Sequence, residues 1–366
     1  MSASGFNPIR DEPLAARTSV KLGGPAEFLA RIQTPAQIPA ALDWARAHGL
    51  PVTVLGGGSN VVISDAGIRG LVLDLSIGAE AVAGEPAEVH TDADHVLVDV
   101  GAGVLWDEFV THCVDRGWAG VECLSGIPGR VGATPIQNVG AYGQEVAGSL
   151  AAVEVYDTQE SRLLTLGHAE CGFGYRTSRF KQADTDRFIV VSVRFRLLPG
   201  GPACLAYPEV ARQFAAGEPP DLQSVRTAVL RTRRGKSMLI DVADENARSC
   251  GSFFLNPELG PAALDQLRGR CSTPPPAFPT TDGRSKVPAA WLIEHAGLVR
   301  GQRFGSVGIS SKHALALVCH PGATARSLVA VAHQVRDTVE SKLGVRLEPE
   351  PRFFGFGSSP DRLPAI

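Results

Sequence analysis

A glycine-rich stretch at residues 124–143, LSGIPGRVGATPIQNVGAYG, constrains the fold of this chain more than any other segment. Five of its twenty residues are glycine and none is acidic, yet it also carries Leu124, Ile127, Val131, Ile136 and Val139. Glycine loses the most conformational freedom on folding, so this composition disfavours a regular helix or strand. Apolar side chains, in contrast, anchor a segment to a core. The stretch therefore predicts an ordered loop whose backbone approaches a ligand. An irregular loop with a purely structural role is the alternative.

A second glycine segment, GGGSN, lies between the apolar runs PVTVL and VVI. Glycine reaches positive φ, and its main-chain N–H groups can gather around an anion. The segment is neither a GxGxxG fingerprint nor a phosphate loop that ends in Gly-Lys-Ser/Thr. Taken alone, it is explained equally well by a tight structural turn. Two such loops in one chain favour a diphosphate-containing ligand that lies between subdomains.

Short strand and helix patterns fill the rest of the chain. We expect strands at 26–32, 51–55, 61–63, 71–75, 88–91, 96–101, 153–158, 187–198 and 313–320, and a short one within 345–357. Helices are expected at 35–48, 106–117, 289–298 and 326–344, and over most of 205–234. The proline-rich run at 271–283 predicts an exposed connector. This order predicts an α+β fold with several small sheets.

The totals exclude some classes of protein. The 366 residues carry a net charge of −3, so no electrostatic case for nucleic acid or an acidic membrane follows. The first residues hold no apolar run of signal-peptide length, and the apolar run at 188–198 is interrupted by arginines. Seven cysteines without a CxxC pair favour neither disulfides nor zinc, and indicate a cytoplasmic protein.

Five motifs carry a resemblance to a known family: LGGGSNVVISDAGIRGLVLDL, LSGIPGRVGATPIQNVGAYG, CGFGYRTSRFK, SCGSFFLNP and LEPEPRFFG. In this order they resemble UDP-N-acetylenolpyruvoylglucosamine reductase, a flavoenzyme of bacterial peptidoglycan precursor synthesis. The resemblance runs from about Arg17 to Gly355. It implies an FAD-binding region of the vanillyl-alcohol-oxidase type in two α+β subdomains, 1–75 (to which 343–366 would return) and 76–236. A separate α+β substrate-binding domain would span 237–342.

The resemblance also implies how FAD is held without a Rossmann fingerprint. Gly56, Gly57, Gly58, Ser59 and Asn60 would surround the pyrophosphate. The rest of the cofactor would be lined by Ser125, Gly126, Ile127, Pro128, Gly129, Gly132, Ala133, Gln137, Asn138 and Gly140. No His or Cys stands at an arguable attachment position, so FAD is expected to be bound non-covalently. The resemblance implies NADPH as the hydride donor and no metal.

Arg176, in YRTSRFK, would bind the carboxylate of an enolpyruvyl substrate, since a guanidinium fork matches a carboxylate. The negative charge of an enolate-like transition state would strengthen this contact. A surface arginine at a strand end is the alternative.

Ser252, in SCGSFFLNP, matches the family's proton donor, which would protonate C2 after hydride reaches C3. Most serines near turns have only a structural role. In LEPEPRFFG the family pattern selects Glu350 over Glu348 as the residue that stabilises, or delivers a proton to, the enol intermediate. Pro351 stands where relatives often have valine, which removes one N–H. A solvent-exposed ion pair with an arginine is the alternative.

Substrate contacts follow from the resemblance with less support. Tyr142 and Tyr175 resemble aromatic contacts, Asn256 a contact to the UDP portion, and Lys236 a contact to the diphosphate. His313 aligns with a polar substrate-side position. Tyr207, in CLAYPEVARQF, would mark the longer of two family types, in which a tyrosine loop closes over the substrate. Lys236 could equally lie on a solvated basic helix end.

Together these residues predict an NADPH-dependent flavoenzyme that reduces UDP-N-acetylglucosamine enolpyruvate to UDP-N-acetylmuramate, with hydride passing from flavin N5 to C3. The expected partner is a nucleotide sugar, with no nucleic acid and no membrane, and the expected state is a monomer. Two alternatives stay open: an FAD-dependent alcohol or lactone oxidase of the same fold, and an inactive nucleotide-sugar-binding protein. Flavin colour and its bleaching by NADPH would separate them.

Overall fold

The computed structural model describes residues 6–79, 88–92, 94–214 and 219–365. Contacts divide the chain into two units, each built from separate stretches of sequence. Unit 1 comprises Met1–Glu12, Ala26–Gly57 and Arg69–Leu239, and unit 2 comprises Pro13–Pro25, Gly58–Ile68 and Ile240–Ile366. The chain therefore passes from one unit into the other in the middle of the GGGSN segment.

The smaller sheet of unit 1 has the strand order β1-β2-β5-β3. Its strands are β1 (Ile9–Pro13), β2 (Pro25–Ile32), β5 (Ile68–Leu75) and β3 (Val52–Leu55). Helix α1 (Gln37–Ala47) packs on this sheet through Ile38, Ala41 and Ala45. Strands β3 and β5 pair in parallel, and β5 lies between β3 and β2, the two strands that α1 connects. The GGGSN segment follows the carboxyl end of β3 directly.

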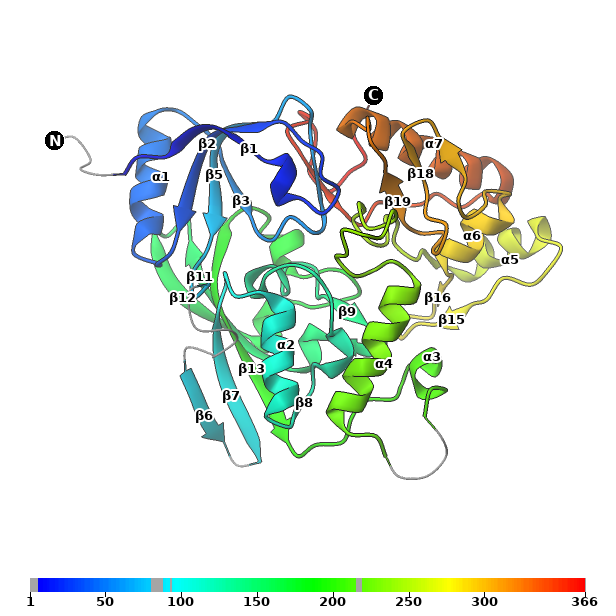
Figure 1. The fold of residues 1–366 in the computed structure, drawn as a ribbon, viewed down its shortest axis with the longest axis horizontal. Coiled ribbons are helices and arrows are strands. Elements are labelled where there is room, and N and C mark those ends of the chain that lie inside the picture. Colours follow the sequence, from blue (N-terminus) through cyan, green and yellow to red (C-terminus); the bar gives the residue numbers. More distant parts are fainter. Residues whose placement is uncertain (1–5, 80–87, 93, 215–218, 366) are drawn as a thin grey trace. The chain divides into compact units, whose positions relative to one another are not determined.

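The larger sheet of unit 1 is antiparallel, with the order β12-β11-β13-β7-β6, and β8 pairs with β13. Its strands are β12 (Arg162–Gly167), β11 (Leu150–Asp157), β13 (Phe188–Pro199), β7 (His95–Gly101), β6 (Glu88–Asp92) and β8 (Trp118–Ala119). Helix α2 (Trp106–Asp115) covers one face of this sheet (Figure 1). Its Phe109 ring lies 4.7 Å from that of Phe195 on β13, centroid to centroid.

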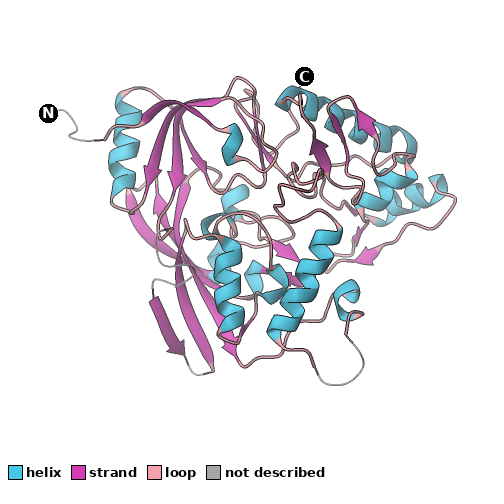
Figure 2. Cartoon of the chain, viewed as in Figure 1, coloured by secondary structure: helices cyan, strands magenta, loops and turns pink. Residues whose placement is uncertain are grey.

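The glycine-rich stretch is a run of short turns and 3-10 helices rather than a disordered linker. Figure 2 shows how loops connect the helices and strands of the chain. The stretch contains η3 (Glu122–Leu124), η4 (Val131–Ala133) and β9 (Gly140–Ala141), and β9 pairs with β10 (Gln144–Glu145), which precedes η5 (Val146–Gly148). Its apolar residues serve as the expected anchors. Leu124 and Val131 are fully buried in the core of the larger sheet, and Ile127, Ile136 and Val139 pack against that core. Helix α4 (Leu222–Gly235), preceded by the short α3 (Pro208–Ala211), completes the unit.

Unit 2 is built around helix α7 (Ala325–Leu343), against which α5 (Pro261–Arg270) and α6 (Ala289–His295) pack. Figure 1 shows these helices beside β18 and β19. Three small sheets contribute: β17-β18-β19 (Arg303–Phe304, Val307–Ile309, Leu317–Cys319), β14-β16-β15 (Glu258–Leu259, Ser285–Lys286, Phe278–Pro279), and the parallel pair β20-β4 (Arg352–Phe354, Val61–Ile63). Val20, Leu22 and Val62, from early in the chain, are buried in the same core as α7.

The architecture confirms the expected α+β class with several small sheets. Residues 205–234 are predicted to be mostly helical, and the structure describes two helices there, α3 and α4. Helix α4 begins at Leu222, where Asp221 accepts the Ser224 N–H as an N-cap. The three-part domain division stays a prediction. No helix within the described residues is long and apolar enough to cross a bilayer. In the same residues, no group of His, Cys, Asp or Glu side chains is suited to hold a metal ion.

Candidate active site

Gly56 and Gly57, the part of the GGGSN segment that belongs to unit 1, lie close to the glycine-rich stretch, with backbone against backbone at Gly57 and Gly129. A methyl group added at Gly57 would come within 2.7 Å of the Gly129 Cα, and one at Gly56 within 3.4 Å of the Ala133 Cβ. Only glycine fits at position 57, because any side chain there would overlap the Gly129 backbone. The two segments therefore expose main chain side by side, and main-chain N–H groups suit a diphosphate-containing cofactor such as FAD. These residues fit the group that the sequence predicts.

Some polar groups of the loop are already engaged within the protein. Ser125 is fully buried and its hydroxyl donates to the Glu122 carbonyl at 2.6 Å. The Gly126 N–H donates to Asp107. Burial alone would raise the pKa of Asp107, but the bonds from Arg226 and Gly126 outweigh it and lower the pKa. The Ser125 hydroxyl and the Gly126 N–H are therefore already bonded, so a contact from either residue to the cofactor would come from its other atoms. Ile127, Pro128 and Gln137 are half-buried.

The second half of GGGSN belongs to unit 2 and is fixed by the turn η1 (Ala15–Arg17) and the residues after it. Gly58 has φ of 66°, and a side chain there would collide with the Arg17 carbonyl. The Ser19 N–H donates to the Gly58 carbonyl at 3.0 Å, and its hydroxyl donates to the Ser59 carbonyl at 3.1 Å. The end of the GGGSN segment is therefore fixed by Arg17 and Ser19, which lie where the family resemblance begins.

Asn60 connects this loop to the C-terminal motif. Its Nδ2 donates to the Glu350 carbonyl at 3.2 Å, and its own carbonyl accepts the Arg352 N–H at 3.0 Å. Strand β4, which follows Asn60, runs parallel to β20, which follows Glu350. Two predicted site residues 290 positions apart in sequence are thereby fixed to one another.

The motif SCGSFFLNP lies on the other side of Glu350. The Glu350 N–H donates to the Phe253 carbonyl at 2.9 Å, and the Leu255 N–H donates to the Glu348 carbonyl at 2.9 Å. Phe253 is fully buried, while Ser252, directly before it, and Glu350 are half-buried. The structure therefore brings Ser252, Glu350 and Asn60 onto three neighbouring stretches of backbone in unit 2.

The remaining predicted residues of unit 2 have structural contacts of their own. Asn256 accepts the Ala289 N–H at 2.9 Å through Oδ1, at the start of α6. His313 is half-buried in the turn between β18 and β19, and its carbonyl accepts the Ala316 N–H. Cys250 is close to the site, but burial raises the pKa of its thiol, which suits an inert side chain.

In unit 1, Arg176 is joined to the end of the glycine-rich stretch. Its Nη2 donates to the Gly140 carbonyl, and its guanidinium lies over the Tyr175 ring at 5.4 Å from the centroid. Asn138 Nδ2 donates to the Gly174 carbonyl at 3.1 Å, and Ser178 Oγ donates to the Ile136 carbonyl at 2.6 Å. The motifs QNVG and YRTS therefore form one cross-linked patch of backbone.

Three predicted site residues of this patch adopt left-handed backbone: Asn138, Tyr142 and Arg176 have φ of 45°, 49° and 52°. Non-glycine residues rarely hold such angles, and those that do cluster at functional sites. For Asn138 the cost is offset locally, because its side chain also donates to Glu145 and accepts the Ala147 N–H.

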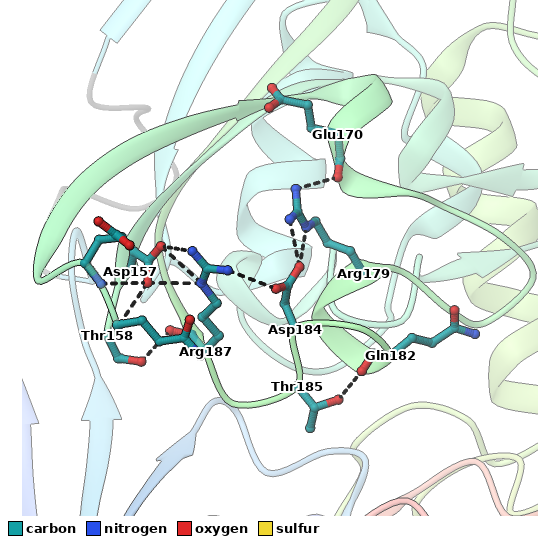
Figure 3. Close-up of polar contacts among 10 residues, drawn as sticks. Asp157, Thr158, Glu170, Arg179, Gln182, Asp184, Thr185 and Arg187 are labelled. Atoms are coloured by element: carbon teal, nitrogen blue, oxygen red, sulfur yellow. Dashed lines mark hydrogen bonds and ion pairs between the residues drawn. The ribbon is translucent and has the colours of Figure 1, made fainter.

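An ion network fixes the segment that carries Tyr175 and Arg176 (Figure 3). Arg187, at the start of β13, binds the fully buried Asp157 carboxylate at the end of β11, with Nη2 and Oδ2 2.6 Å apart. Arg187 also contacts Asp184, which pairs with Arg179 at 2.7 Å. The hydrogen bonds from Arg187 are the main reason that the pKa of Asp157 falls to about 2.

Tyr142, Tyr207 and Lys236 form a second cluster in unit 1. The two rings meet edge to face with centroids 5.2 Å apart, and the Lys236 Nζ lies 5.9 and 5.8 Å from them. Burial raises the pKa of the Tyr142 hydroxyl, although the positive charges of Arg233 and Lys236 act in the opposite direction. Arg233 itself is buried, and its Nε has no hydrogen-bond partner.

Several residues of these clusters were not predicted from the sequence. Arg130, within the glycine-rich stretch, pairs with Asp74 and the Leu75 carbonyl of β5. Glu122 is a buried carboxylate two residues before the stretch, and Glu209 pairs with Lys236. An acidic residue shortly before a glycine loop, and another two positions after a tyrosine, are common in any sequence. No signal short of the structure singles them out.

Two parts of the chain match known protein families. Residues 26–167 match a family described as FAD binding domain, and residues 243–354 match one described as UDP-N-acetylenolpyruvoylglucosamine reductase, C-terminal domain.

Whole proteins of that name are similar over nearly the full chain. The UDP-N-acetylenolpyruvoylglucosamine reductase of Thermobifida fusca (strain YX) is 44% identical over 355 residues, which are 94% of this chain and 98% of that protein. The protein of the same name from Salinispora arenicola (strain CNS-205) is 44% identical over 362 residues, 96% of each chain. The crystal structure of UDP-N-acetylenolpyruvylglucosamine reductase from Thermus caldophilus is 26% identical, with a TM-score of 0.64, and the match covers 96% of this chain and 100% of that one.

Proposed function

From the premise that this chain belongs to the UDP-N-acetylenolpyruvoylglucosamine reductase family, we propose how its residues carry out the reaction. The chain is an FAD-dependent oxidoreductase with UDP-N-acetylmuramate dehydrogenase activity, which serves peptidoglycan precursor synthesis. Its substrate is a nucleotide sugar. The proposal concerns the hydride donor, the binding of FAD and the part of each side chain.

The main chain of Gly56–Asn60 and the stretch 125–140 would hold FAD non-covalently, with NADPH as the hydride donor. The contact between Gly57 and Gly129 supports this assignment, since it leaves two backbone segments without side chains next to each other. Bound FAD would supply the chemistry of hydride transfer from NADPH to C3 of the enolpyruvyl group. The protein supplies positioning and proton transfer.

Ser252 protonates C2, and Glu350 stabilises or protonates the enol form of the substrate. The observation that carries this proposal is the hydrogen bond from the Glu350 N–H to the Phe253 carbonyl, which holds the two residues on adjacent backbone. A serine hydroxyl is a weak acid, but the carbon that it protonates is strongly basic after hydride arrives. Glu350 is kept in register by Asn60.

Arg176 binds the substrate carboxylate. Its left-handed backbone and its bond to the Gly140 carbonyl support a guanidinium whose direction is set before substrate arrives. Tyr142, Tyr175, Asn256 and His313 contact the nucleotide sugar, Lys236 meets its diphosphate, and Tyr207 marks the longer family type with a closing loop. We further propose that the enzyme is a cytoplasmic monomer.

Replacement of Ser252 by alanine tests the proposal in two half-reactions. NADPH should reduce the flavin of Ser252→Ala at nearly the wild-type rate, since the hydroxyl takes no part in that step. Reoxidation by the enolpyruvyl substrate should fall by roughly 10²–10⁴-fold, the usual range for a lost general acid. Stopped-flow absorbance of the flavin measures both rates.

Ser249→Ala is the matched control. Ser249 lies three residues upstream, and its Oγ accepts the Gly251 N–H. This variant should be reoxidised at close to the wild-type rate. Equal loss of both half-reactions in Ser252→Ala would contradict its part as proton donor. Failure of the wild-type flavin to be reoxidised by the substrate would contradict the proposed reaction itself.

A further inference from the structure

Lys236 already holds an anionic partner from its own chain. Its Nζ pairs with Oε2 of Glu209, the second residue of α3. Burial works to lower the pKa of Lys236, but the bond to Glu209 and the nearby tyrosines outweigh it and raise the pKa. The lysine is therefore charged at neutral pH, and its charge is balanced by a side chain two residues beyond Tyr207.

The pair also fixes the two tyrosines. Tyr207 is the N-cap residue of α3, so the backbone that carries Glu209 also carries this ring. The ammonium lies within 6 Å of the centroids of Tyr142 and Tyr207, a distance at which the face of an aromatic ring attracts a cation. Lys236 thus holds α3 and the tyrosine pair together in one arrangement.

We propose that Glu209 competes with the substrate's diphosphate for Lys236. The inference rests on the proposed function, in which Lys236 meets that diphosphate. A diphosphate beside Lys236 would bring its negative charge close to the Glu209 carboxylate, and like charges at that range repel. Binding therefore breaks the Glu209–Lys236 pair and releases α3, together with Tyr207, to rearrange around the ligand.

This competition makes the site selective for charge. A ligand with two phosphates gives Lys236 a more highly charged anion in place of the Glu209 carboxylate. A ligand without phosphate offers no such anion, so it does not offset the loss of the Glu209–Lys236 pair. The side chains of Lys236 and Glu209 are 26% and 42% exposed, so water screens the pair partly. Exposed pairs of this kind change an equilibrium by about 1.5- to 5-fold.

Titration of the FAD-loaded protein with UDP and with uridine, by calorimetry, tests the inference. Glu209→Gln removes the charge and keeps the shape of the side chain, and it should bind UDP about 1.5- to 5-fold more tightly than the wild type. Its affinity for uridine should not change. Glu209→Ala should shift UDP affinity in the same direction. Lys236→Met should weaken UDP binding, and Glu209→Gln should have no effect in the Lys236→Met background.

Asp43→Asn is the matched control, because it removes one negative charge from an exposed pair with Arg46 in the same unit. Its UDP affinity should equal that of the wild type. If Lys236→Met weakens UDP binding while neither Glu209 variant tightens it, the competition is wrong and the proposed function stands. Equal tightening by Asp43→Asn, or tightening by Glu209→Gln without Lys236, would also overturn it. If the wild type does not bind UDP, the proposed function fails first.

Discussion

Glu122 is a charged residue only 1% exposed, and it links the glycine-rich stretch to the tyrosine segment. Its Oε1 accepts the Gln144 side-chain amide and the Cys204 N–H, both at 2.8 Å, and its Oε2 accepts the Gly120 N–H at 2.8 Å. A buried carboxylate with three donors is well satisfied, whereas each donor left alone would carry a desolvation cost. Three chain segments therefore depend on one side chain.

We predict that Glu122→Ala lowers the free energy of unfolding by about 2 to 4 kcal/mol, because the three donors lose their acceptor. Glu122→Gln keeps an oxygen that can face Gln144 and Cys204 and should lose only about 1 to 2 kcal/mol. Urea unfolding followed by circular dichroism measures both values. If glutamine proved as damaging as alanine, the account by acceptor geometry would be wrong.

Gly140 and Gly132 should respond differently to a side chain. At Gly140 an added Cβ would lie 2.7 Å from the Glu145 Cγ, 2.9 Å from the Gln144 carbonyl oxygen and 3.0 Å from the Arg176 Nη1. Two of these atoms belong to long side chains that can move, and the carbonyl belongs to the two-residue strand β10, so Gly140→Val should fold with some loss of stability and a displaced Arg176. At Gly132 the Cβ would lie 2.5 Å from that of Ala102 and 3.0 Å from its Cα, where the backbone itself blocks it.

The two valine variants therefore distinguish an effect on the candidate active site from an effect on folding. Gly140→Val should keep a cooperative melting transition. In the role that we propose for Arg176, a displaced guanidinium would no longer stabilise the transition state, so the flavin should be reoxidised by substrate at least 10-fold more slowly. Gly132→Val should lose folded yield before any effect on substrate can be measured. A folded, fully active Gly140→Val would show that Arg176 is not held through this contact.

For single residues, the sequence predicted those that belong to motifs, but it did not predict which residues they would bond to. Ser252 and Glu350 stand in recognisable motifs, whereas the bond from the Glu350 N–H to the carbonyl of Phe253, the residue after Ser252, joins segments about a hundred residues apart. Glu122 and Glu209 belong to no motif, since a single carboxylate near a loop is ordinary in any soluble protein. Pairing of such residues is decided by tertiary packing.

Among the elements, the segment between β12 and β13 shows how a loop can be made rigid by charge. It carries Arg176 but no strand or α-helix, only η6 (His168–Cys171) and η7 (Arg179–Lys181). Its C-terminal half is held by the Arg179–Asp184 pair and by Arg187, which binds Asp157 at the end of β11. Protonation of these carboxylates should break the ion pairs and make the loop more mobile.

The stability contributed by Asp157 should therefore depend on acid. Its folded pKa of about 2 is below the ordinary value of about 3.9 for an unfolded chain. The contribution is complete above pH 4 and is lost as the pH falls towards 2, because protons then favour the unfolded state. Asp157→Asn should be less stable than the wild type at pH 7, and the difference should shrink between pH 4 and pH 2.

Urea unfolding of both proteins across this pH range makes the comparison. Asp43→Asn serves again as the control, since it removes a carboxylate that is 64% exposed in the same unit. A difference between wild type and Asp157→Asn that stays constant down to pH 2 would contradict the assigned pKa shift.

Regular elements with strong periodicity were predicted well, and short ones were not. Helices α1, α2, α6 and α7 and strands β2, β3, β11 and β13 lie where their apolar patterns place them. Strand β12 and helix α5 were missed. The outer strand β12 is mostly exposed, and α5 buries only Leu264 and Leu267, so neither has a clear apolar face. The strand expected at 313–320 is only Leu317–Cys319, because the residues before it turn.

In the whole molecule, unit 2 cannot be cut out as a continuous piece. Its core includes Val20, Leu22 and Val62, and its strand β20 pairs with β4 from the first fifth of the chain. We predict that residues 240–366 expressed alone do not fold cooperatively, since β20 loses its partner and the core loses three buried side chains. Circular dichroism during thermal melting tests this.

The matched control for that fragment is the full chain under the same conditions, which should melt in a sharp transition. A fragment that melts as sharply as the full chain would show that the early residues add nothing essential. This discontinuity is also the feature that periodicity could not predict. The division into an FAD-binding region and a C-terminal domain came from the family resemblance, which five separate motifs support.

The bond between Asn60 and Glu350 has a consequence for the order of events during synthesis. Asn60 leaves the ribosome 290 residues before its partner, an interval of about 15 to 60 s at ordinary translation rates. Until then the end of GGGSN lacks the strand that fixes it. FAD should therefore be captured tightly only by finished chains, and nascent or truncated chains should stay colourless.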